Sequence, residues 1–211
     1  MTRIAYGLTA LAVLAGANTA GAQTISVSPA APSRWDAGGS VGWFGGNEES
    51  TLNDWDDWYD AGTGSLEVGR YWGTHLKTEV SLSTSSEGET YSQTQVPGGT
   101  TFPLYRFTRH FFQTTQLAGS AVYQFGENSW VHPFAGGGVL VNWEEERREI
   151  QDPRLSPVVE NYRTTVVRPF VTGGFKFYVH ERAYIRTDVQ AAFRPKGMEQ
   201  LTWRGGVGFD F

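Results

Sequence analysis

The last eleven residues, LTWRGGVGFDF, alternate between apolar and polar side chains. Apolar and aromatic residues occupy one parity from Leu201 to Phe211, and Thr202, Arg204 and Asp210 fall on the other. A period of two over this length is typical of a β-strand that has one apolar and one polar face.

The same alternation predicts an all-β chain. We expect eight strands: Trp35 to Gly45, Gly62 to Trp72, Leu76 to Ser83, Phe112 to Phe125, Val131 to Trp143, Thr165 to Tyr178, Ala183 to Phe193 and Leu201 to Phe211. Their even number suits an eight-stranded antiparallel up-and-down transmembrane β-barrel of the bacterial kind.

The connections between these strands alternate in length. Residues 73–75, 126–130 and 180–182 form short connections, whereas 46–61, 84–111 and 144–163 form long ones, and 195–200 is brief. Outer-membrane barrels have tight periplasmic turns on one rim and long extracellular loops on the other. We therefore expect three long loops outside the cell, and both termini in the periplasm.

Charged residues on the polar parity predict which face lines the interior. Five acids and five bases share it: Asp36, Glu67, Lys77, Glu79, Arg168, Lys176, Arg186, Asp188, Arg204 and Asp210. Charges removed from bulk water must pair, and a balanced set allows this. Glycines on the same parity agree, because the lumen of an eight-stranded barrel is only wide enough for side chains.

The partners within this charged set stay open, because the barrel shear cannot be read from the sequence. We expect Arg186 or Arg204 to meet Glu67 or Glu79, with Lys77 and Asp188 also taking part. Such a network would close the lumen with charged side chains.

Aromatic residues gather at strand ends on the apolar parity. The predicted girdle consists of Trp35, Trp43, Trp72, Tyr123, Trp143, Phe177, Trp203 and Phe211. Eight residue steps separate Trp35 from Trp43, which in a tilted strand is roughly 20 Å along the membrane normal, close to the ~25 Å apolar band of such barrels. We expect this parity to face lipid. A soluble, ligand-binding calycin is the alternative, and it requires the opposite assignment of faces.

The amino-terminal region has the features of a secretory signal. Arg3 precedes an apolar run from Ile4 to Ala15, and Ala20-Gly21-Ala22 forms a small-residue cleavage site. The predicted organisation is a signal peptide over 1–22, a periplasmic lead-in over 23–33 and the barrel domain over 34–211.

The chain has no cysteine and a net charge of −5. The absence of cysteine excludes disulfides, and the negative charge argues against nucleic acid as a partner.

Histidines offer little evidence of catalysis. None of His75, His110, His132 and His180 has a serine beside it in a recognisable motif, and four scattered histidines do not predict a metal site. We therefore expect no enzyme and no catalytic, metal or cofactor site. A triad assembled across strands stays open as an alternative, because local sequence cannot show it.

The segments "HPFAGGGV", "RPFVTGGF" and "GVGFDF", together with the strand pattern, resemble small outer-membrane barrels of the OmpA-type, OmpX and OmpW-like superfamily. The resemblance implies a cell outer-membrane location, with membrane lipid and lipopolysaccharide around the barrel. It also implies that Val207, Phe209 and Phe211 form the signal read by the barrel-assembly machinery.

We expect a non-enzymatic structural or interaction role through the extracellular loops, whose partner is unknown, above a charge-plugged lumen. The alternative is a narrow porin-like channel or conduit for small solutes.

Overall fold

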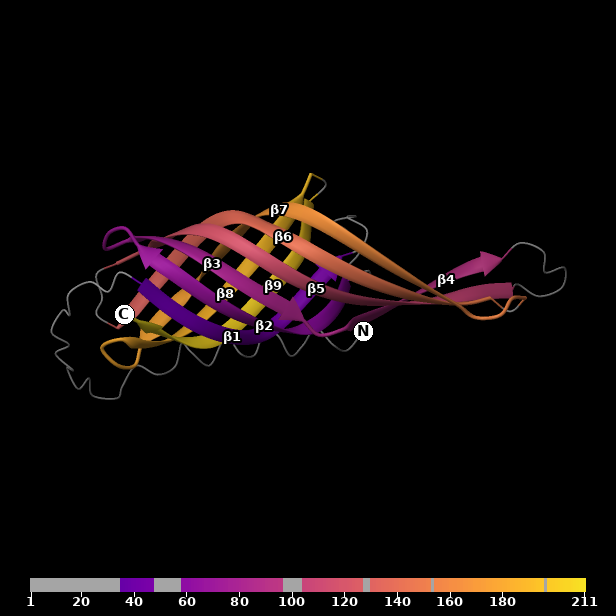
Figure 1. Cartoon of the computed structure of the whole chain (residues 1–211), viewed down its shortest axis with the longest axis horizontal. Coiled ribbons are helices and arrows are strands. Elements are labelled where there is room, and N and C mark those ends of the chain that lie inside the picture. Colours follow the sequence, from indigo (N-terminus) through magenta and orange to yellow (C-terminus); the bar gives the residue numbers. More distant parts are fainter. Residues whose placement is uncertain (1–34, 48–57, 97–103, 127–129, 153, 196) are drawn as a thin grey trace, which may run out of the picture.

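The computed structural model describes residues 35–47, 58–96, 104–126, 130–152, 154–195 and 197–211 (Figure 1). The predicted signal peptide (1–22) and lead-in (23–33) lie outside these residues, as does most of the first long connection. Over the described residues, no helix is long and apolar enough to cross a membrane.

The described chain is built from nine β-strands. They are β1 (Trp35–Asn47), β2 (Trp58–Tyr71), β3 (Leu76–Ser85), β4 (Gly88–Val96), β5 (Leu104–Gln124), β6 (Val131–Gln151), β7 (Val158–Tyr178), β8 (Ala183–Arg194) and β9 (Gly197–Asp210). All of their pairings are antiparallel.

Eight of these strands form a closed ring. The sheet runs β3-β2-β1-β9-β8-β7-β6-β5-β4, and a further pairing of β3 with β5 closes it. Leu82 lies opposite Leu117 at this closure, and at the turn rim the backbones of Trp35 and Phe211 exchange hydrogen bonds of 2.8 and 3.1 Å. The predicted eight-stranded up-and-down barrel is confirmed, with β4 outside the ring.

The prediction of loops over 84–111 and 144–163 is wrong. Strand β4 forms a hairpin with residues 104–112 of β5, and β6 and β7 continue as paired strands beyond the ring. Together β4, 104–112, 146–151 and 158–162 form a four-stranded extension, here called the projecting sheet, at the end of the barrel opposite the carboxyl terminus (Figure 1). Its strands mix charged, polar and apolar residues, with Tyr105, Phe107 and Val159 among the exposed apolar ones. No regular alternation of polar and apolar residues runs through all four strands, although Thr, Tyr and Val favour strands.

The polar parity faces inward and the apolar parity outward. All ten predicted lumen charges are buried, whereas Val41 is 72% exposed and Val207 is 67% exposed. A soluble calycin requires the reverse arrangement, because an exposed apolar belt of this extent suits lipid and not water.

The predicted girdle aromatics lie on the outer surface in two groups. Trp35, Trp72, Tyr123, Phe177 and Phe211 lie near the turn rim, and Trp43, Trp143 and Trp203 lie toward the opposite rim. Trp43 and Trp203 are direct cross-strand partners. The spacing between the groups matches an apolar band bounded by aromatic residues.

Small residues on the inner face make room for the lumen side chains. A Cβ added at Gly69 would lie 2.8 Å from Cδ of Lys77 and would also collide with Asp36. This close approach explains why a glycine, which otherwise weakens a strand, occupies the position.

Candidate functional site

The half of the lumen next to the turn rim is organised around Asp36 of β1. Its Oδ2 accepts hydrogen bonds from Nζ of Lys77 at 2.9 Å and from Nζ of Lys176 at 2.8 Å. The Lys176 ammonium group also donates to the hydroxyl of Tyr71 at 2.7 Å and lies 3.5 Å from Asp210. One buried carboxylate thus joins strands β1, β3 and β7 across the lumen.

Arg186 of β8 occupies the middle of the lumen. Its guanidinium donates to both carboxylate oxygens of Glu79 at 2.6 and 3.1 Å and lies 3.0 Å from Glu67. It also lies 3.3 Å from Asp188, and its Cζ is 4.6 Å from the centre of the Phe134 ring. Bidentate pairing fixes the plane of the guanidinium as well as its position.

The remaining contacts join these two groups into one network. Lys77 lies 2.5 Å from Glu79, and Arg204 lies 2.6 Å from Asp188. Nine of the ten sequence-predicted lumen residues therefore belong to a single network. Within it, Arg186 pairs with Glu67 and Glu79, and Arg204 pairs with Asp188. Because its acids and bases nearly balance, the network needs little water to compensate its charge.

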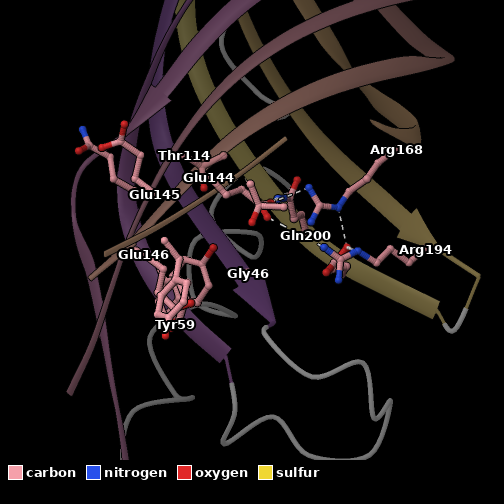
Figure 2. Close-up of a pocket in the computed structure, with 14 residues that line it drawn as sticks. Gly46, Tyr59, Thr114, Glu144, Glu145, Glu146, Arg168, Arg194 and Gln200 are labelled. Atoms are coloured by element: carbon pink, nitrogen blue, oxygen red, sulfur yellow. Dashed lines mark hydrogen bonds and ion pairs between the residues drawn. The ribbon is translucent and has the colours of Figure 1, made fainter. Parts of the chain in front are cut away.

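Arg168, the tenth residue, lies apart from this network at the mouth of the barrel. Its guanidinium is 2.6 Å from Glu144 and 2.5 Å from Glu199. Arg194 approaches from the same side of the pocket and lies 2.6 Å from Glu199 (Figure 2). A pocket of about 170 Å³ opens above these pairs, with Tyr59 stacked on Phe112 in its wall at 4.5 Å between ring centres.

The alternation pattern does not reveal the two glutamates of this mouth cluster, for different reasons. Glu144 continues the inward parity of β6, beyond the predicted end of that strand at Trp143. Glu199 belongs to the outward parity of β9, but the pairing of β8 with β9 shifts register at Ala192/Phe193, opposite this residue. A β-bulge of this kind re-aims a side chain, and Glu199 is consequently buried.

Most polar groups of the mouth cluster already have partners within the barrel. Each carboxylate of the mouth cluster already meets a guanidinium, and a hydrogen bond of 3.2 Å between Gln116 and Gln200 crosses the space between this cluster and the central network. Paired groups have little capacity left for a ligand.

Comparison with protein families decides the family of the chain. A model described as "Outer membrane protein beta-barrel domain" matches residues 8–211. The chain belongs to this family. As an outer-membrane β-barrel, it carries its polar network inside and its apolar belt toward lipid, which agrees with the faces described above.

Solved structures give the same fold for this outer-membrane barrel. Neisserial surface protein A (NspA) is 14% identical with a TM-score of 0.54, and the match covers 84% of this chain and 96% of that one. OprG from Pseudomonas aeruginosa is 12% identical with a TM-score of 0.52, covering 85% and 96% respectively. The N-terminal barrel of Pseudomonas aeruginosa OprF is 14% identical with a TM-score of 0.50, covering 86% and 100%. At these identities the likeness concerns the fold alone. No curated protein matches the chain.

Proposed function

We propose that the barrel is a closed, non-conducting scaffold in the outer membrane that holds the projecting sheet outside the cell. In this proposal the barrel itself is structural and not catalytic. It supports the envelope and presents the projecting sheet and loops to a partner, whose identity stays open.

The buried network around Arg186 carries this proposal. It draws on β1, β2, β3, β7, β8 and β9, so it bridges the lumen from opposite walls. A path for hydrated solutes would have to break several buried ion pairs, each of which is costly to separate in a low-dielectric interior.

Single-channel recording tests the closed lumen. The wild-type protein, refolded in detergent and inserted into a planar bilayer, should show no steady openings, whereas Arg186→Ala should show small, flickering conductance. Steady openings from the wild type would contradict the closed scaffold and favour the alternative function, a narrow channel for small solutes. Silence from both proteins would show that the closure does not depend on Arg186.

The orientation in the membrane is part of the same proposal. The short turns and both ends of the chain would lie in the periplasm, after removal of the signal peptide. Membrane lipid and lipopolysaccharide would cover the apolar belt, and the assembly machinery would read Val207, Phe209 and Phe211. Support comes from the exposure of these three side chains on one outward face of β9 and at its end.

Deletion of Phe211 tests the assembly signal. We expect the amount of folded protein in the outer membrane to fall several-fold, while refolding from denaturant into detergent stays efficient. Phe125→Ala is the matched control, because this residue is also an exposed phenylalanine at the turn rim. Equal losses for the two variants would mean that the aromatic contact with the membrane interface matters and not an address.

A further inference from the structure

The inner face of the projecting sheet brings together a serine, a histidine and a glutamate from three strands. Oγ of Ser92 on β4 lies 3.0 Å from Nε2 of His110 on β5, and Nδ1 of the same imidazole lies 2.9 Å from Oε1 of Glu146 on β6. The imidazole thus has the hydroxyl at one ring nitrogen and the carboxylate at the other. This is the connectivity of a serine nucleophile, its general base and the carboxylate that orients the base.

The nucleophile and the base of this triad differ in their exposure to solvent. Ser92 is exposed on β4, the outermost strand of the sheet, whereas His110 is buried and packs in parallel with the Phe112 ring at 6.1 Å. The nucleophile is therefore accessible, while the base is held in one orientation.

Arg148 keeps the carboxylate in its charged form. Its Nη2 donates to Oε2 of Glu146 at 3.0 Å, and its Nε donates to Oε1. Burial acts to raise the pKa of Glu146, but the hydrogen bonds from Arg148 and His110 hold that pKa below its usual value. An ionised Glu146 selects the imidazole tautomer that carries its proton on Nδ1, so that the lone pair of Nε2 points to the hydroxyl of Ser92 and accepts its proton.

We propose that Ser92, His110 and Glu146 form a serine hydrolase site that cleaves carboxylic esters outside the barrel. The inference goes beyond the scaffold function, because it concerns the projecting sheet and not the lumen. The sequence predicts a protein without catalytic activity but leaves open a triad assembled across strands. The proposed site is such a triad.

The reaction balances with water as the only second reactant. Oγ of Ser92 bonds to the ester carbonyl carbon while its proton passes to Nε2 of His110. The tetrahedral intermediate then breaks the bond to the alcohol oxygen, which leaves with the proton from Nε2. Water attacks the acyl-serine with His110 again as base, and the carboxylic acid departs as Ser92 regains its proton.

The cross-strand row that contains Ser92 indicates the kind of ester. Thr108 lies directly opposite Ser92, followed by Ile150 and then Val158, all on the same face. The Thr108 hydroxyl is the nearest side-chain donor in that row for the developing oxyanion. Ile150 and Val158 offer a small apolar surface for the acyl group, so the site suits a short acyl chain.

The test uses the full mature chain, refolded in detergent, with p-nitrophenyl butyrate as substrate and a fluorophosphonate as covalent probe. We expect hydrolysis above the buffer rate and labelling of the peptide that contains Ser92. Ser92→Ala should abolish this labelling and lower kcat/KM by at least about 100-fold, the lower range for loss of acid–base and nucleophilic assistance. Ser156→Ala is the control, because Ser156 is exposed and lies outside the strands.

Glu146→Gln separates positioning from folding. As a positioning residue, Glu146 should change the pH profile of hydrolysis, because the variant removes the carboxylate that pairs with Nδ1 of His110 and leaves the charges of Arg148 and Glu160 in the same cross-strand row. A merely structural role would lower the folded fraction and leave the profile of the folded molecules unchanged. Folded wild-type protein that neither labels at Ser92 nor exceeds the buffer rate would overturn the proposal, as would labelling that survives in Ser92→Ala.

Discussion

Arg186→Ala should lower the free energy of unfolding by about 3 to 5 kcal/mol, the range for removing one partner of a buried ion pair. The guanidinium contacts Glu67, Glu79 and Asp188 together. Without it, Lys77 and Arg204 would each keep one of these acids, and Glu67 would lose the cation nearest to it. The cost comes from leaving carboxylates buried without a partner, more than from the pair energy itself.

Urea titration of the barrel in lipid vesicles, followed by tryptophan fluorescence, measures this loss. Arg182→Ala is the matched control, because Arg182 is an exposed residue of the turn before β8 and should change stability by less than about 0.5 kcal/mol. The double variant Glu79→Gln, Arg186→Met should recover part of the loss, since fewer charges stay unpaired. Equal midpoints for Arg186→Ala and the wild type would contradict the network as a source of stability.

Gly206→Val should destabilise the barrel strongly, whereas Gly205→Val, one residue earlier in β9, should be tolerated. A Cβ at Gly206 would lie 2.5 Å from Cβ and 2.7 Å from Cα of Ser40 and would also collide with the carbonyl oxygen of Gly39. These atoms belong to the β1 strand paired with β9, so they cannot yield without loss of the ladder. A Cβ at Gly205 meets no atom within 4 Å.

We expect overpacking at Gly206 to cost at least about 1 to 3 kcal/mol, and more if refolding fails altogether. At Gly205 the added side chain points away from the lumen, where valine also favours the strand, so stability should stay equal or rise slightly. Refolding yield and urea midpoint of the two variants measure the difference. Similar losses of stability in the two variants would show that the backbone freedom of glycine, and not the space inside the barrel, explains why glycine occupies positions 205 and 206.

Much of the barrel follows from the sequence because its signal is local. Alternation assigns each residue to a face within its own strand, so the inward placement of Arg186 and the outward placement of Trp203 need no knowledge of the neighbouring strands. Short and long connections then arrange the strands in an up-and-down order. The correct choice of faces rested on charge balance and aromatic position, which are also properties of the sequence.

The partners of those residues required the tertiary structure. Asp36 and Tyr184 are 148 residues apart and meet within 3.2 Å because of the ring closure and the stagger of the strands. Hydropathy contains no information about that stagger. For the same reason the sequence left open whether Arg186 or Arg204 meets Glu79.

Two features of the structure could not be predicted from the alternation of apolar and polar residues, because one interrupts this alternation and the other lacks it. A register shift between β8 and β9 buries Glu199 against its parity. The strands of the projecting sheet mix polar and apolar residues, so no regular alternation runs through all four of them. Ser92, His110 and Glu146 are separated by 18 and 36 residues.

The sequence by itself thus determined the strand order and the inner face of the barrel, because those depend on local periodicity. Only the tertiary structure decided the ion pairs and the serine–histidine–glutamate cluster, because cross-strand register sets which distant side chains meet.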